Sequence, residues 1–575
     1  MKKISLYLFV LLLHVAACRP AGKTGNEVRI RLGQDPENLN PVSYTSKDAS
    51  QQINLLYQSL LTVDLADGKL KPLLAESMPE IVQQDSFSYF TYRIRPEARW
   101  ANGSPVTAAD VAFSLKTIKC PLVNNEKIRP DFDFVQEIRI DAADPKKFTL
   151  LCKGFTPDHL LMSGERFFVM PEYVADPKGL LRTFTLAQLD AEFDDLTEDP
   201  QIQAFAEQFN SADFTRNPEK LQGSAGYELL SWKTGQEISF KQKTGWWGHE
   251  LKPSLAHLTA NPEKITFRVI PDNAAALVAL KNQQIDVWQN IPATAFEQLR
   301  QDEKMAQQFN FFTPQTYSFV YLGLNGRSEK LRDAPTRRAL AHLTDLDAII
   351  KTTQQGLAVK TIGPVSPSDQ NLYHSGIQPY QYNEARAIDL LKEAGWQKNG
   401  TVWQRKTNGR LQTLELKLSY KAGNSEYENM ALIFQQAAAK IGIPVALQPL
   451  ENAVLSANLK QGNFDLFIRS LTGNPFVFNF KPILHTQSTG PEGINYTAFG
   501  TSESDRLIEN LYTSNSETEK VAMLKRLQEI LHEESNLIFL FFQQDRAAIS
   551  KCFGNLKISG IKPGYDVSAF TLQEK

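Results

Sequence analysis

The first eighteen residues constrain this chain more than any other segment, because they decide the compartment in which the rest of it folds. Lys2 and Lys3 precede a mostly apolar stretch over residues 4–15, which is followed by small residues. A basic start, a short apolar run and small residues are typical of an export signal. The run is shorter than the roughly 20 apolar residues that a bilayer-spanning helix needs. We therefore predict that residues 1–17 are a removable signal peptide and that the body of the protein is extracytoplasmic.

The small residues Ala16 and Ala17 directly precede Cys18. This arrangement resembles a bacterial lipobox, in which the cysteine is acylated and becomes the first residue of the mature protein. Residues 18–26 are then a polar, lipid-anchored linker, and the protein is tethered to a membrane in the periplasm or at the cell surface. The alternative is an ordinary signal peptide that is followed by a chance cysteine.

The length and charge of the chain limit its possible architectures and partners. Its 575 residues exceed the roughly 250–300 at which single cores usually split, so we expect two or three domains. The 62 basic and 64 acidic residues give a net charge of −2, which offers no electrostatic argument for a nucleic-acid partner. The most apolar segment after the N-terminal one is residues 537–542. It has only six residues and is typical of a buried strand.

Four cysteines are too few for a disulfide scaffold. If Cys18 is acylated, Cys120, Cys152 and Cys552 remain, which is an odd number. A bridge between Cys120 and Cys152 is compatible with an extracytoplasmic location, and buried free thiols are an equal alternative.

Apolar periodicity and turn residues predict a mixed α/β protein. Residues 414–420 alternate like a strand, residues 427–441 follow helical spacing up to Gly442, and residues 445–449 form a strand again. This β-α-β order predicts a partly parallel sheet. Other strands are expected at residues 28–32, 87–94, 265–270 and 320–324, and other helices at residues 49–61, 274–280 and 383–394.

No catalytic or metal-binding motif is found. The eight histidines are never within four residues of each other, so none forms a local metal pair. The segment after His532 lacks the second histidine of H-E-x-x-H, and the chain has no G-x-S-x-G elbow, no Walker A and no G-x-G-x-x-G. We predict that the protein is not an enzyme and that it holds no cofactor and no structural metal.

An ordered series of segments resembles one family. Residues 70–77 (LKPLLAES), 92–100 (YRIRPEARW) and 102–114 (NGSPVTAADVAFS) are similar to a run of the peptide/oligopeptide/nickel-type substrate-binding proteins of ABC importers, solute-binding family 5. The series continues through almost the whole mature chain at residues 223–227, 267–272, 280–286, 321–325, 333–340, 385–395 and 462–465. Each segment alone is weakly specific, whereas their order is specific.

The resemblance implies an α/β, two-lobed fold like that of periplasmic binding proteins, in the large three-domain variant of type II, with a hinge and an inserted subdomain. Lobe I is then expected from residues 27–57, 223–320 and 537–575. Residues 58–222 form the inserted subdomain and residues 321–536 form lobe II. The partners that it implies are a small-molecule or peptide ligand and the permease subunits of an ABC transporter, and the receptor is expected to be a monomer.

Dipeptide binders of this family hold the ligand's ammonium with a carboxylate and its carboxylate with an arginine, both in lobe II. Here the acidic position falls on Asn474 and the arginine position on Lys421. Asn474 cannot neutralise an ammonium, and Lys421 lacks the planar fork of arginine. The alternatives without a role in ligand binding are that Asn474 only shapes the loop before Pro475 and that Lys421 is a solvated surface residue. The other predicted ligand-binding residues are Tyr44, Thr45, Tyr317, Leu471 and Thr472.

The resemblance thus predicts a receptor for an oligopeptide or a related polar solute. Alternatives in the same fold are an oligosaccharide, an opine or a metal–chelate complex; aromatic residues such as Tyr44, Tyr317 and Phe476 would favour a sugar. A signalling or adhesion lipoprotein without transport is the alternative from another class, and no motif supports a hydrolase.

We expect the substitution Asn474→Asp to tighten the binding of peptides with free amino termini by up to about 1–2 kcal/mol, because a hydrogen bond to a charged group is stronger than a neutral one. The gain should disappear for N-acetylated peptides, which carry no ammonium. Calorimetry on both proteins with matched free and acetylated peptides tests this. Equal affinities in all four combinations would show that position 474 does not contact the amine.

Overall fold

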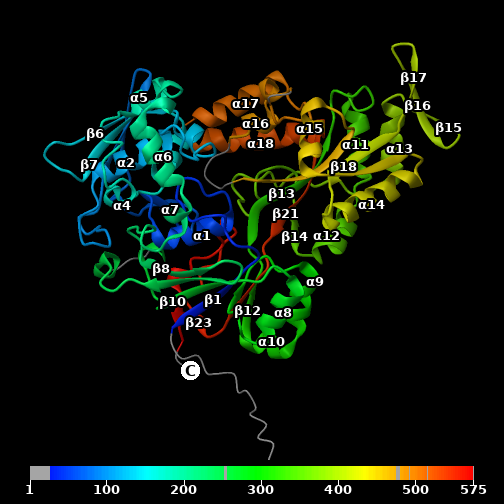
Figure 1. Ribbon diagram of the computed structural model, residues 1–575. Helices are drawn as coiled ribbons and strands as arrows, with labels where there is room; N and C mark the ends of the chain where they lie inside the picture. Colours follow the sequence, from blue (N-terminus) through cyan, green and yellow to red (C-terminus); the bar gives the residue numbers. More distant parts are fainter. Residues whose placement is uncertain (1–25, 252–255, 474–478, 491–492, 515, 574–575) are drawn as a thin grey trace, which may run out of the picture.

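Two separate β-sheets organise the molecule (Figure 1). The structure, a computed structural model, describes residues 26–251, 256–473, 479–490, 493–514 and 516–573. Across these residues, no helix combines the length and the apolar character that crossing a membrane requires. Cys18 and the predicted signal peptide lie outside the described residues.

The first sheet has seven strands and draws on both halves of the chain. Its central strand β1 (Glu27–Leu32) is parallel to its two neighbours, and the remaining pairs are antiparallel. Helices α8 (Asn273–Lys281), α9 (Ala293–Gln301) and α10 (Glu303–Gln308) contribute to an apolar cluster beside it. In order, the strands are β12 (Phe309–Phe312), β22 (Ala547–Ser550), β11 (Val287–Trp288), β1, β10 (Lys264–Val269), β9 (Glu237–Gln242) and β8 (Tyr227–Lys233).

The second sheet has six strands, and helices cover both of its faces (Figure 1). The predicted β-α-β unit is confirmed, since β18 and β19 are parallel and α14 (Ser425–Lys440) connects them. The strand order is β14 (Ala358–Lys360), β21 (Leu537–Gln544), β13 (Gln315–Leu324), β20 (Leu466–Thr472), β18 (Leu416–Lys421) and β19 (Val445–Leu450). One face packs against α14 together with α11 (Ala334–His342), α12 (Leu346–Gln354) and α13 (Glu384–Glu393); the other packs against α15 (Asn452–Gln461), α16 (Lys481–Leu484), α17 (Ser502–Thr513) and α18 (Glu517–Glu534).

The apolar run at residues 537–542 is a fully buried strand, as predicted, but it belongs to the second sheet. The sequence placed residues 537–575 in lobe I. In the structure, β21 instead lies between β13 and β14, and only from β22 onward does the chain rejoin the first sheet. The physical reason is that alternate side chains of β21, such as Ile538 and Phe539, fill the apolar clusters on opposite faces of the second sheet.

The inserted subdomain carries a sheet of its own, shown in cyan at the left of Figure 1. The strands are β4 (Glu80–Gln84), β5 (Phe87–Arg93), β7 (Lys147–Lys153) and β6 (Val135–Ile140), all antiparallel. Helix α2 (Ala108–Lys119) begins after Thr107, where the Asp110 carboxylate accepts the backbone N–H of Thr107 at 2.8 Å. One continuous apolar cluster joins this subdomain to β1, so the two share a core.

Tertiary packing shortens one predicted helix and decides the state of two cysteines. The helix expected over residues 49–61 is α1 (Lys47–Leu56), because buried Tyr57 turns the chain into extended backbone that leads to β2 (Leu61–Val63). Cys120 and Cys152 are not bridged, and both are buried free thiols. Burial raises the pKa of each thiol to about 12.

The two sheets are connected where β12 continues into β13 and where β21 continues into β22. At this double crossing, the backbone N–H of Asp545 donates to the carbonyl of Pro314 at 2.9 Å, and Gln315 pairs with Gln544. The buried Asp545 carboxylate also accepts a hydrogen bond from Lys562. A pair of adjacent, hydrogen-bonded segments is the geometry of a hinge.

A second contact joins the lobes away from the hinge. The Tyr512 hydroxyl of α17 donates to Asp158 of α3 (Pro157–Gly164) in the inserted subdomain at 2.5 Å. Burial and the Asp158 carboxylate raise the pKa of Tyr512 to about 12, so the hydroxyl keeps its proton at physiological pH. Opening of the hinge has to break this bond.

We therefore expect Tyr512→Phe to shift the ligand-free protein toward more open conformations, since a hydrogen bond to a charged group contributes roughly 1.5–3 kcal/mol. Small-angle scattering should show a larger average radius of gyration. Tyr427→Phe is the matched control, because that hydroxyl bonds Ser470 within lobe II at 3.0 Å. The same radius for all three proteins would contradict a role for Tyr512 in holding the lobes together.

Candidate ligand site between the lobes

A cavity of about 640 Å³ lies between the two lobes. Ligand sites in proteins typically occupy about 300–1,000 Å³. Other hollows of similar size, beside α17 and α18 and beside β5, are lined from one lobe only. The polar residues that line the interlobe cavity include Tyr44, Asp48, Ser50, Gln51, Asn54, Tyr57, Gln58, Asp131, Glu165, Arg166, His257, Gln289, Asn290, Tyr317, Ser318, Thr472 and Lys562.

Lobe II contributes the ends of two neighbouring strands. Ser318 of β13 stands opposite Thr472 of β20, and their hydroxyl oxygens lie 2.7 Å apart. One residue further along, the backbone N–H of Gly473 donates to the carbonyl of Tyr317 at 2.9 Å. The ladder thus fixes Tyr317 and Thr472 side by side at the cavity wall.

Lobe I contributes an aromatic wall. The ring of Tyr44 lies 6.3 Å from that of Phe168 at a tilted angle, and both residues line the cavity. Burial raises the pKa of the Tyr44 phenol, so it stays protonated and can donate or accept a hydrogen bond.

Each cationic group at the cavity has an acidic neighbour. Arg166 Nε donates to Asp131 Oδ2 at 2.9 Å, and this pairing holds the pKa of Arg166 above its usual value although burial opposes it. Lys562 is bound to Asp545, as described for the hinge. His257 Nδ1 lies 3.3 Å from Asp566 Oδ2.

Glu165 differs from these groups. It follows α3, caps its last turn with its backbone N–H, and is only partly exposed at the cavity. Burial raises the pKa of its carboxyl, and the positive charges of Arg166 and His257 offset this only in part.

Of the residues predicted from sequence, the structure brings together Tyr44, Tyr317 and Thr472 at the cavity. Three others are elsewhere. Thr45 is exposed, and its hydroxyl donates to Glu37 at 2.8 Å. Lys421 is exposed at the end of β18, and Leu471 packs into the apolar cluster beneath β20. Asn474, like Phe476, lies outside the described residues.

The bond to Thr45 has a structural function. Burial opposes ionisation of Glu37, but hydrogen bonds from backbone amides, including that of Thr45, outweigh this effect. They lower the pKa of Glu37 to about 2, so the carboxylate is permanently charged and fixes the loop that carries Tyr44.

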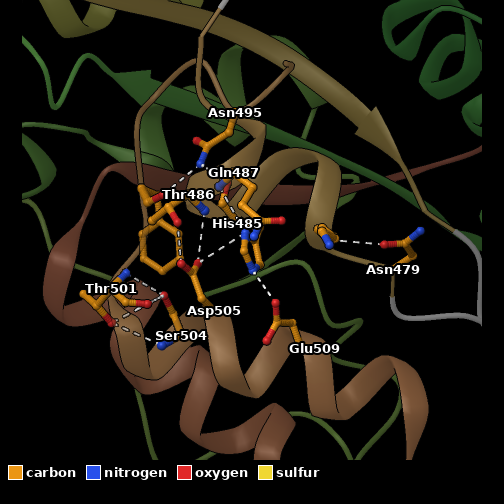
Figure 2. Close-up of polar contacts among 11 residues, drawn as sticks. Asn479, His485, Thr486, Gln487, Asn495, Thr501, Ser504, Asp505 and Glu509 are labelled. Atoms are coloured by element: carbon orange, nitrogen blue, oxygen red, sulfur yellow. Dashed lines mark hydrogen bonds and ion pairs between the residues drawn. The ribbon is translucent and has the colours of Figure 1, made fainter. Parts of the chain in front are cut away.

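The segment from residue 479 onward is fastened to α17 by a buried histidine (Figure 2). His485 Nδ1 accepts the backbone N–H of Gln487 at 3.1 Å, which leaves Nε2 to donate to Glu509 at 3.3 Å. Thr486 donates its backbone N–H to Asp505 at 3.0 Å, and the Asn495 side chain donates to the carbonyl of His485 at 3.0 Å. The network fixes the segment that begins at residue 479 against α17.

Sequence reasoning missed most of the charged lining, including Glu165, Arg166, Asp131 and Lys562. These side chains come from the inserted subdomain and from the C-terminal segment, and no local pattern marks them. In the part of the chain that the structure describes, no group of three or more His, Cys, Asp or Glu side chains could hold a metal ion.

Comparison with known proteins gives consistent matches along the chain. Residues 69–490 match the family model of bacterial extracellular solute-binding proteins, family 5 Middle. The oligopeptide-binding protein AppA of Bacillus subtilis (strain 168) is 24% identical, with 98% of this chain and 97% of AppA covered. The dipeptide-binding protein of Escherichia coli (strain K12) is 22% identical, with 88% and 87% covered. The solved structure of NikA from Brucella suis in complex with Fe(III)-EDTA has a TM-score of 0.72 at 22% identity, with 95% of this chain and 100% of NikA covered, and it confirms the predicted fold.

We expect His485→Ala to loosen residues 479–490 and 493–501, because it deletes a buried ring together with its hydrogen bonds to Gln487 and Glu509, each of which contributes about 0.5–1.5 kcal/mol. Hydrogen exchange should show faster exchange of these amides, with little change in the first sheet. His485→Asn should retain part of the protection, since its carbonyl can still accept the N–H of Gln487. Unchanged exchange in His485→Ala would contradict the fastening function.

Proposed function

The chain belongs to family 5 of the bacterial extracellular solute-binding proteins, and on that basis we propose that it captures a polar solute outside the cytoplasm and delivers it to the permease of an ABC transporter. The observation that carries this proposal is the interlobe cavity beside a two-segment hinge. A ligand that contacts both lobes stabilises the closed conformation and so shifts the population toward it. The permease can then distinguish the loaded receptor from the empty one.

The ligand that the cavity fits best is an oligopeptide or a related polar solute. Hydroxyl and amide groups line both lobes, and these can bond a peptide backbone. AppA and the dipeptide-binding protein are named for oligopeptides and a dipeptide, which points in the same direction.

The charges of the cavity disfavour an anionic metal chelate as the ligand. An anionic metal chelate would face the carboxylates of Asp48 and Glu165, while Arg166 is already paired with Asp131. A sugar could stack on Tyr44 and Tyr317, but binding of a sugar in this way would not use the charged groups that line the cavity. We propose that the protein binds and releases its ligand unchanged, as a monomer.

Mass spectrometry under native conditions tests the proposal, using protein purified from its own host without refolding. Retained peptide should appear as added mass that disappears on denaturation, and scattering should show a smaller radius of gyration with ligand than without it. Bound sugar or chelate would favour those alternatives, and cleaved peptide products would indicate an enzyme.

We also propose that Cys18 carries the lipid that holds the receptor at the membrane. Cys18→Ser should then release the protein into the soluble fraction, because acyl chains supply the apolar contact with the bilayer. The wild-type N-terminal peptide should carry the mass of the acyl groups and begin at residue 18. A mutant that remains in the membrane fraction, together with an unmodified wild-type Cys18, would contradict the anchor.

A further inference from the structure

One carboxylate at the cavity is left without a partner in the protein. Within the described residues, no hydrogen bond or ion pair joins the Glu165 carboxylate to another side chain. The other two lining carboxylates differ. Asp131 is bound to Arg166 at 2.9 Å, and Asp48 lies in the field of Arg31, whose positive charge it favours.

The cationic groups around the cavity are already engaged. Arg166 is directed to Asp131 and Lys562 to Asp545, so neither is available to neutralise Glu165 fully. The cavity thus carries an excess of negative charge on its lobe I side. A partly buried, unpaired carboxylate is costly unless a ligand supplies the missing positive charge.

The surroundings of Glu165 suit a compact cation. Tyr44 lies close enough for its phenol to feel the charge of Glu165, and its ring and that of Phe168 form a wall of the same cavity. Aromatic faces attract ammonium groups, and the phenol oxygen can accept one of the three ammonium hydrogen bonds.

We propose that Glu165 is the site that binds the primary ammonium of the ligand, such as the amino terminus of a peptide. This rests on the proposed function of the cavity and names the group that it selects. It also assigns the charge recognition that Asn474 cannot provide to the inserted subdomain of lobe I.

The affinity for a ligand that carries an ammonium group should depend on pH. An ammonium favours the ionised form of Glu165, whereas burial in the empty cavity raises the pKa of this carboxyl. Protonation of Glu165 therefore competes with the ligand. Affinity should fall as the pH is lowered through this raised value, before ordinary surface glutamates titrate at about 4.3.

The test uses the full mature receptor and three probe pools: randomised tetrapeptides with free amino termini, the same peptides N-acetylated, and linear aliphatic polyamines. Native mass spectrometry and calorimetry compare wild type, Glu165→Gln, Glu165→Asp and Glu207→Gln. Glu207→Gln is the matched control, because it removes the same charge from an exposed position on α6 (Pro200–Asn210) of the same subdomain.

We expect Glu165→Gln to weaken the binding of free-amine peptides about 10- to 100-fold, the ratio that a charged hydrogen bond of roughly 1.5–3 kcal/mol gives. Glu165→Asp should recover part of the affinity, Glu207→Gln should retain all of it, and N-acetylated peptides should not distinguish the variants. The unliganded Glu165→Gln protein should also melt at a higher temperature than wild type at neutral pH.

The remaining outcomes separate the two proposals. Glu165-dependent binding of polyamines without peptide binding would support the ammonium site and overturn the peptide ligand. Equal binding of free and acetylated peptides by wild type and Glu165→Gln would overturn the ammonium site and leave peptide binding intact. Binding of no pool would overturn both.

Discussion

The double crossing between the two sheets is the constraint on which the rest of the molecule depends. Because β12 continues into β13 and β21 continues into β22 side by side, the lobes are joined by two adjacent segments that bond each other through Asp545 and Pro314. Two adjacent segments permit closure about one axis, so the ligand cavity has to lie between the lobes beside this axis, where Lys562 and Gln289 line it and also bond Asp545.

The charges of the cavity and the charges of the hinge are arranged differently. At the hinge, the buried Asp545 is bound by Lys562 and by Gln289, so its charge is satisfied inside the protein. In the cavity, Arg166 and Asp131 satisfy each other, while among the described residues no side chain forms a hydrogen bond or an ion pair with the Glu165 carboxylate. An unpaired carboxylate lowers the stability of the empty receptor, and the same group gains most from a cationic ligand. If Glu165 selects the ligand as proposed, the same carboxylate that provides selectivity also lowers the stability of the empty receptor.

Local features were predictable because they depend on neighbours in sequence. The capping pair Thr107 and Asp110, the β-α-β unit around α14 and the buried strand at residues 537–542 all follow from periodicity and end signals. The assignment of that strand to lobe I was wrong, because periodicity shows that a strand is buried but not which sheet surrounds it. Likewise, the spacing of residues that resembles peptide binders pointed to Lys421, which is exposed at the end of β18.

The sequence by itself predicted an export signal, and it determined the mixed α/β composition, the order of the family segments and the absence of known catalytic motifs. Three residues of the cavity could be named in this way, Thr472 because its segment follows the family pattern and Tyr44 and Tyr317 as aromatic candidates near the expected cleft. Only the tertiary structure decided which charges meet there. Glu165 and Arg166 belong to the inserted subdomain and Lys562 to the C-terminal segment, so Lys562 lines the same cavity only after the chain has crossed between the sheets twice. Which of them are paired depends on distances of a few ångströms, and no local pattern in the chain encodes these.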